Sequence, residues 1–178
     1  MHLGRAILSN SDFETITIGE QVWMKRNLSI TNFRNGDPIL EAKSFEEWKT
    51  AGKEGQPICR MDEKKFGKQY NWHAVNDKRG LAPEGWRIPT KEDFRTLAVA
   101  VNYNGNALKA KGQGDGAGVG TNTSGFSALI RGGAEFFWTS TEPWSNTAYS
   151  VDLQLSDSSI SVTTNDKEVP CRVRCIRI

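Results

Sequence analysis

The chain has 178 residues, a nearly balanced charge of +2 from 23 basic and 21 acidic residues, and a mean hydropathy of −0.54. This length suits one domain with a sizeable core, predicted over residues 15–178 after an N-terminal extension at residues 1–14. The balanced charge gives no sign of a nucleic acid or anionic membrane partner. No apolar run approaches the roughly 20 residues that span a bilayer.

The first predicted element is a β-hairpin. Residues 15–18 alternate polar and apolar side chains, and residues 21–24 form a second short strand. Gly19 and Glu20 separate the two strands, and a Gly-X pair in this position is typical of a type II′ turn. We therefore expect antiparallel pairing at the start of the domain.

Two helices are predicted from capping signals. Ser44 and Glu47 have the spacing of a capping box, which predicts a short helix after Ser44. Residues 81–90 form a turning, Pro-containing segment that ends in Thr90, with Asp93 three residues further on as a weaker capping box. Apolar residues then follow at helical spacing. They are Phe94, Leu97, Ala98 and Val101.

The C-terminal half predicts strands after a glycine-rich segment. Glycine occupies every second position from 112 to 120. We interpret this segment as a flexible surface loop and not a nucleotide-binding turn, because no strand precedes it and no helix follows it. Five strands are predicted after it, over residues 126–130, 136–140, 147–155, 159–164 and 169–178.

Six short motifs occur in order along the chain, at residues 19–28, 70–75, 81–90, 122–129, 137–141 and 173–177. With these motifs the chain resembles the Fibrobacter succinogenes major paralogous domain, a family of bacterial surface-associated domains. The resemblance implies an α+β, C-type-lectin-like fold with short antiparallel strands, two or so helices and long loops. It also implies that the N- and C-terminal strands are adjacent. Superfamily members include glycan binders, adhesins and a few enzymes, so the fold alone does not fix a function.

Aromatic residues within these motifs are predicted to form the core, because each lies in an apolar segment bounded by turns. They are Trp23, Trp72, Trp86, Phe126 and Trp138. Catalytic signals are sparse. His2 lies in the N-terminal extension, His73 is interpreted as a packing residue, and no metalloprotease, hydrolase or redox motif occurs.

Three cysteines, Cys59, Cys171 and Cys175, are predicted to be reduced and buried. Cys171 and Cys175 are four residues apart in a predicted strand, about 13 Å, which is too far for a disulfide. A disulfide from Cys59 is the alternative. The resemblance adds another: formylglycine-generating enzymes of this superfamily bind copper through two cysteines, and thiolates suit Cu(I). Alternation of Cys171 and Cys175 with valine instead favours core packing.

The resemblance also suggests a calcium site. Calcium-dependent lectins place a Glu-Pro-Asn loop and a Trp-Asn-Asp segment around the ion, and oxygen ligands of this kind suit calcium. Glu142, Asn165 and Asp166 occur in comparable order here, although Trp144 and Thr164 replace the lectin Asn and Trp. The alternative is two polar turns without a metal, and no other cofactor is predicted.

A ligand surface is expected between residues 112 and 146 and on the neighbouring strand. Along residues 149–155 one alternating face is predicted to be core and the other, with Ser150, Asp152 and Gln154, to be exposed. Trp144 and Asn146 precede this strand, and an aromatic beside amide and carboxylate groups can stack on a sugar or anchor a protein. Trp144, Asn146 and Asp152 are therefore the candidate ligand-binding residues, with packing of Trp144 onto the core as the alternative.

These features favour a non-enzymatic binding or adhesion module that recognises a glycan or protein ligand. Two alternatives are an oxidoreductase-like enzyme that uses Cys171 and Cys175, as a copper-dependent oxidase, and a purely structural surface domain. The segment after Met1 does not resemble a signal peptide. The expected location outside the cytoplasm, at the cell surface, in a secreted protein or a lipoprotein, therefore comes from the family resemblance alone.

Overall fold

The computed structural model describes residues 13–178, so His2 and most of the predicted N-terminal extension lie outside the described residues. The helices are α1 (Phe45–Lys53), α2 (Trp72–Val75) and α3 (Lys91–Ala100). The strands are β1 (Thr15–Ile18), β2 (Gln21–Met24), β3 (Leu40–Glu41), β4 (Ile58–Met61), β5 (Lys68–Tyr70), β6 (Trp86–Arg87), β7 (Ala134–Trp138), β8 (Thr147–Gln154), β9 (Ile160–Asp166) and β10 (Ile176–Arg177). Single 3-10 turns occur at Lys64–Phe66, Gly105–Ala107 and Gly116–Gly118.

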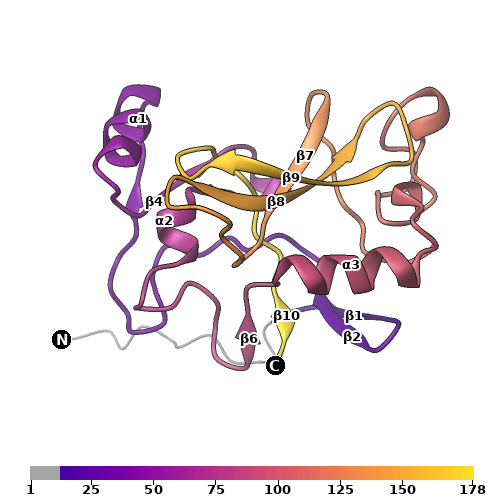
Figure 1. Ribbon diagram of the computed structural model, residues 1–178, viewed down its shortest axis with the longest axis horizontal. Helices are drawn as coiled ribbons and strands as arrows, with labels where there is room; N and C mark the ends of the chain where they lie inside the picture. Colours follow the sequence, from indigo (N-terminus) through magenta and orange to yellow (C-terminus); the bar gives the residue numbers. More distant parts are fainter. Residues whose placement is uncertain (1–12) are drawn as a thin grey trace.

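The strands form three small sheets (Figure 1), in the orders β1-β2-β10-β6, β3-β4-β5 and β7-β8-β9. Pairing is antiparallel except between β3 and β4. In the first sheet β10 pairs with β2, so the N- and C-terminal strands are adjacent, as the resemblance implies. The predicted α+β class is confirmed.

The predicted hairpin and helix starts are also confirmed. Ile18 pairs with Gln21 across a two-residue turn, and Gly19 has φ of 60°, as the first turn position of a type II′ turn requires. Ser44 accepts a hydrogen bond from Glu47 N at 3.1 Å, while the Glu47 carboxylate accepts one from Lys43 N rather than from Ser44. Local chemistry therefore fixes where these elements begin.

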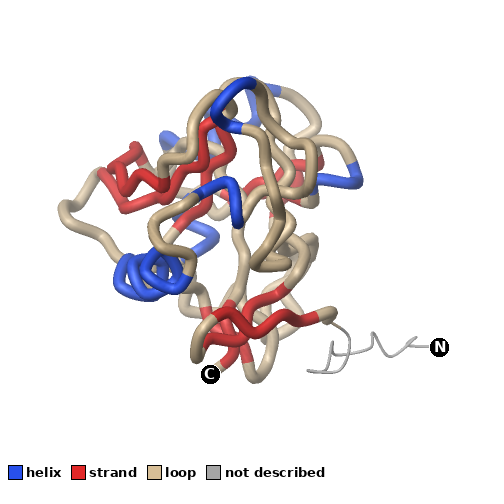
Figure 2. Tube along the Cα trace, turned by 90° about the vertical axis from the view of Figure 1, so that its right-hand side faces the viewer, coloured by secondary structure: helices blue, strands red, loops and turns tan. Residues whose placement is uncertain are grey.

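Helix α3 lies between the β7–β9 sheet and the β1–β2 hairpin. Figure 1 shows it running below β8, and Figure 2, from the side, shows it nearly end-on with strands above and below. Its apolar face is buried as predicted, and the Phe94 ring packs 5.1 Å from Trp23 and 6.3 Å from Phe137. Aromatic packing thus joins the two sheets through α3.

Two hydrophobic cores lie on opposite faces of the β7–β9 sheet. Phe137 and Val151 face the core around α3, whereas Trp138 and Ala148 face a second core built on residues 70–88 and the C-terminal segment. The aromatic residues predicted to be core, Trp23, Trp72, Trp86, Phe126 and Trp138, are at most 3% exposed. Because both faces of this sheet are covered, polar residues of β8 such as Ser150 and Asp152 are buried.

The C-terminal segment crosses all three sheets instead of forming the single strand predicted over residues 169–178. Cys171 exchanges backbone hydrogen bonds with Tyr70 of β5, and Arg172 N donates to Phe136 O of β7 at 2.8 Å. Further on, Met24 N of β2 donates to Cys175 O at 3.0 Å. Because its hydrogen-bond partners change along the chain, the segment forms a regular strand only at β10. Residues 171–176 are all buried, including Arg172 and Arg174.

Residues 126–130 are not a strand, which corrects the prediction. Ser127 has φ of 59°, a left-handed conformation that interrupts extended backbone, and its N–H donates to the Asn122 side chain at 2.9 Å. Ala128 forms only an isolated bridge to a distant segment, with its N–H donating to Leu108 O at 2.8 Å. The segment is therefore a loop pinned to residues 108–110.

The glycine-rich segment lies at the surface, as predicted, but part of it packs closely against neighbouring backbone. A Cβ at Gly118 would lie 2.1 Å from Leu155 O, and one at Gly120 would lie 2.4 Å from Ala110 O. The segment also encloses the buried Lys109 ammonium group, which donates to Gly118 O at 2.8 Å and to Asp157 O at 2.6 Å. Glycine is required at positions 118 and 120 because neighbouring backbone comes too close for a side chain.

Candidate functional site

The loop between β7 and β8 presents the one exposed tryptophan. Trp144 is 64% exposed, while the other five tryptophans of this chain are at most 3% exposed. Leaving an indole in water forgoes the roughly 1.5–3 kcal/mol that burying a large apolar side chain contributes. The alternative that Trp144 packs onto the core is thus excluded in this structure.

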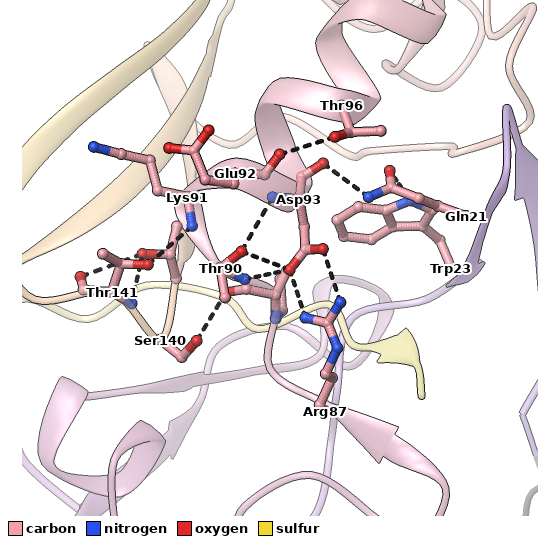
Figure 3. A network of polar contacts seen from close by, with 12 residues as sticks. Gln21, Trp23, Arg87, Thr90, Lys91, Glu92, Asp93, Thr96, Ser140 and Thr141 are labelled. Carbon is pink, nitrogen blue, oxygen red and sulfur yellow. Dashed lines mark hydrogen bonds and ion pairs between the residues drawn. The ribbon is translucent and has the colours of Figure 1, made fainter.

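The β7 end of this loop is fixed to the start of α3 (Figure 3). Thr141 accepts a hydrogen bond from Lys91 N at 3.1 Å, and Ser140 N donates to Pro89 O at 2.8 Å. These contacts reach the helix at its capped first turn. The loop therefore leaves the sheet from a rigid point.

That first turn of α3 is itself held by Asp93. Its carboxylate accepts hydrogen bonds from Thr90 N at 2.7 Å and from Arg87 at 2.5 and 2.8 Å, and Thr90 Oγ1 accepts from Asp93 N (Figure 3). The capping box predicted from Thr90 and Asp93 is confirmed. Burial acts to raise the pKa of Asp93, but the bonds from Arg87 and Thr90 outweigh it and hold the pKa below 3.8.

The other end of the loop is fixed by Lys167, immediately after β9. Its Nζ lies 3.2 Å from Glu142 Oε2 and donates to Ser145 O at 2.6 Å, while its backbone N–H donates to Asn146 O at 3.2 Å. The ammonium group also lies 4.5 Å from the Trp72 ring centroid. Lys167 thus contacts the loop at both sides of Trp144.

A cavity of about 360 Å³ opens beside the loop. Its walls include Asn146, Asp166, Lys167, His73 and the last turn of α1. Burial lowers the pKa of His73, helped by the charge of Lys167, so the imidazole is neutral at pH 7. Amide, carboxylate, ammonium and neutral imidazole groups suit hydrogen bonding to a polar ligand, and Trp144 directly precedes two residues of the cavity wall, Ser145 and Asn146.

Asp152 does not join Trp144 and Asn146. It is 1% exposed, and its carboxylate accepts hydrogen bonds from Gln154 and, at 3.5 Å, from Thr163. The expected exposure of the Ser150, Asp152 and Gln154 face is wrong, because that face of the sheet is also covered. Burial raises the pKa of Asp152, against the hydrogen bonds that lower it.

The candidate calcium ligands do not converge. Glu142 is paired with Lys167, and the Asn165 amide donates to Ser150 Oγ at 2.6 Å on one face of the sheet. Asp166 is the next residue of β9, so its side chain points to the other face. Among residues 13–178 no group of three His, Cys, Asp or Glu side chains is placed to hold a metal ion. The calcium site stays a prediction without geometric support.

The three cysteines are free thiols in the core, as predicted. Cys59, Cys171 and Cys175 are each fully buried in the core around residues 70–88. Burial raises the pKa of Cys59 to about 11 and raises the pKa values of Cys171 and Cys175 further above the normal range. Protonated thiols are poor ligands for copper, which binds thiolates.

Sequence reasoning did not identify Lys167 as part of this site. Nothing in the sequence distinguishes it from the other basic residues, although it directly follows Asn165 and Asp166. His73, interpreted from the sequence as a packing residue, is half-buried and also lines the cavity. The candidate site was predicted from the tryptophan in a polar turn.

The geometry defines the class of protein: an α+β domain whose terminal strands are adjacent and whose loop between β7 and β8 is exposed and held at both ends. The chain belongs to the Fibrobacter succinogenes major domain family, whose sequence model matches residues 16–177. No curated protein and no solved structure gives a significant match to the chain. None of the helices in the described part of the chain is long and apolar enough to cross a membrane.

Proposed function

We propose that this chain is a non-enzymatic, surface-associated module that binds a glycan or protein ligand through the loop between β7 and β8, residues 139–146, here called the Trp144 loop. The observation that carries this proposal is the 64% exposure of Trp144 on a loop held at both ends. A rigid aromatic gives up little conformational entropy on binding, and tryptophan is enriched at the centres of binding sites. The adjacent cavity supplies polar partners for hydroxyl or amide groups.

The enzyme alternative has less support. A copper oxidase using Cys171 and Cys175 would need thiolates that reach a substrate, whereas both side chains are buried and burial raises their pKa values. The location outside the cytoplasm is part of the proposal and comes from the resemblance to surface-associated domains.

The proposal is tested by screening the full chain against glycan and peptide arrays, followed by titration of each ligand found. Trp144→Ala should weaken binding at least tenfold, because truncating a central tryptophan removes most of its contact area. Tyr103→Ala is the matched control. Tyr103 is 68% exposed in the turn after α3, at the opposite end of that helix from the Thr141 contact.

Both variants should melt at the wild-type temperature, since neither side chain is buried. Unchanged affinity of Trp144→Ala for the ligand would show that the loop is not the binding surface. Arrays without any reproducible ligand would favour a structural domain, and stoichiometric copper in metal analysis would favour the enzyme.

A further inference from the structure

A second cavity, of about 400 Å³, lies on another part of the molecule and is strongly basic. It opens between the end of β2, the turn at Lys64–Phe66 and the loop at residues 127–129. Its lining carries five cationic side chains and one carboxylate, Glu14. The cations are Lys25, Arg26, Lys64, Lys65 and Arg174.

Arg174 lines this cavity from a buried position and has no carboxylate in direct contact. The side chain is 2% exposed, and no acidic group among residues 13–178 lies within ion-pair distance of it. Its Nε and Nη2 donate to Asn27 Oδ1 at 2.9 and 2.7 Å, and Nη1 donates to Phe126 O. A buried charge is normally paired with an opposite charge, so an unpaired one is unusual.

The neighbouring Arg172 shows the ordinary arrangement. It is also fully buried, but its guanidinium contacts Glu135 at 3.1 Å and Asp62 at 2.8 Å. The two arginines are two residues apart on the same segment, and only Arg172 contacts a carboxylate directly, although the charge of Glu135 also acts on Arg174 at longer range. Arg174 is therefore a buried cation without a direct carboxylate contact, beside a cavity whose mouth is also cationic.

Some N–H groups of the Arg174 guanidinium form no hydrogen bond. A guanidinium carries five N–H groups, and three hydrogen bonds are formed, which leaves two N–H groups without a partner in the described part of the chain. The centre of the Phe126 ring lies 4.1 Å from its central carbon, which is within the range of a cation–π contact. Burial lowers the pKa of Arg174 to about 9, so the guanidinium remains charged at neutral pH.

The charges at the mouth are only partly compensated. Arg26 pairs with Glu14 at 3.3 Å and Lys65 pairs with Glu63 at 3.2 Å, both at exposed positions. Lys25 and Lys64 have no acidic group within ion-pair distance in the same residues. A cleft lined by one sign of charge attracts ions of the opposite sign.

We propose that this cavity binds an oxyanion, a carboxylate, sulfate or phosphate, carried by a small or sugar-sized ligand, with Arg174 as the fixed donor and Lys25, Lys64 and Lys65 at the mouth. The volume is at the small end of the range for ligand pockets. Guanidinium groups match the geometry of carboxylate and phosphate oxygens, and the lysines add charge without demanding a fixed orientation. This site is separate from the Trp144 loop and does not depend on it.

Calorimetric titration of the full chain tests the proposal with three probes: an oligogalacturonide, a neutral oligosaccharide of equal length, and inorganic phosphate. We expect at least one anion to bind, the neutral oligosaccharide to bind at least tenfold more weakly, and higher salt to weaken anion binding. Preference for the oligogalacturonide would identify an acidic sugar as the source of the oxyanion. Preference for phosphate would identify a phosphorylated ligand or the free ion.

The double variant Lys64→Gln/Lys65→Gln should weaken anion binding about tenfold, since two favourable charge contacts are lost. The matched control Lys43→Gln/Lys49→Gln removes the same charge from exposed positions outside the cavity and should bind as the wild type does. All four lysines are exposed, so both variants should keep the wild-type melting temperature.

The Nε–H resonance of Arg174 in ¹⁵N NMR spectra gives a readout that needs no change to the buried residue. It should shift in proportion to the fraction of bound anion. The proposal is overturned if no anion binds, if the Lys64/Lys65 variant binds with wild-type affinity, or if the Arg174 resonance does not move. Binding that is lost in Arg60→Gln instead would place the anion in the other arginine-lined cavity, near Arg172, and would also overturn it.

Discussion

Lys167 and Glu142 are paired at 3.2 Å across the base of the Trp144 loop, joining the residue after β9 to the residue two positions before Trp144. The Lys167 side chain is 12% exposed, so the pair is less screened by water than a typical surface ion pair. It holds a charged side chain that would otherwise be free beside the candidate ligand cavity. The pair therefore affects both the conformation of the loop and the charge on the cavity wall.

Replacing Lys167 with Gln should loosen the loop. We expect the free energy of unfolding to fall by about 1–2 kcal/mol, from the lost hydrogen bond to Ser145 O, the ion pair and the contact with Trp72. Amide hydrogen exchange at residues 144–147 should accelerate more than exchange in β8. Lys49→Gln, an exposed change on α1, is the control. Unchanged exchange in the loop would show that Lys167 does not brace it.

Replacing Trp86 with Ala should destabilise the domain by about 3–5 kcal/mol, because it removes a large, fully buried side chain. Chemical denaturation followed by far-UV circular dichroism measures the change. Trp144→Ala serves as the comparison, since it removes the same side chain from an exposed position and should leave stability within about 0.5 kcal/mol of wild type. Equal stability of the two variants would contradict the assigned core.

The contribution of Asp93 should depend on pH. Because the pKa of Asp93 is held below 3.8 in the folded state, its ionised form stabilises the fold above pH 3.8, and this contribution is lost as the pH falls through the lowered pKa. We expect Asp93→Asn to cost about 1–2 kcal/mol at pH 7 and progressively less below pH 3.8. Urea denaturation of both proteins across this range measures the difference.

The control for Asp93 is Glu92→Gln, one residue earlier on α3. Glu92 is paired with Arg95 at 3.1 Å with both side chains more than 60% exposed, so its loss should change stability by less than about 0.5 kcal/mol at any pH. A wild-type minus Asp93→Asn difference that grows as the pH falls would have the wrong sign for this mechanism.

The cysteines should titrate as three free thiols when the unreduced protein is denatured. In the native state the reaction with a thiol reagent should be slow, because all three side chains are buried and burial raises their pKa values. Protein treated with a reductant beforehand is the control and should give the same count. A count of one before reduction would reveal a disulfide.

Several elements could be predicted from the sequence because their causes are local. Gly19 supplies the positive φ that the hairpin turn needs, and Thr90 with Asp93 supplies the helix cap. The strand predicted over residues 126–130 failed because the left-handed backbone of Ser127 depends on a hydrogen bond to Asn122. Alternating apolar residues do not reveal that interaction.

The candidate site was predicted in part. Trp144 and Asn146 do lie at one turn, and Trp144 is exposed, while ligand binding by these residues stays a prediction. The exposure predicted for Asp152 was wrong for a general reason. Alternation along a strand shows which residues share a face, whereas the packing of other segments determines whether that face is covered.

The amino-acid sequence by itself determined the family, the α+β class and four of the five buried tryptophans, because these depend on motifs and on local backbone preferences. Only the tertiary structure determined which charges meet. Lys25 and Arg26 follow β2, Lys64 and Lys65 begin a distant turn, and Arg174 is near the C-terminus, yet all five line one cavity. A net charge of +2 conceals this cluster, since electrostatic potential depends on distances in space and not on position along the chain.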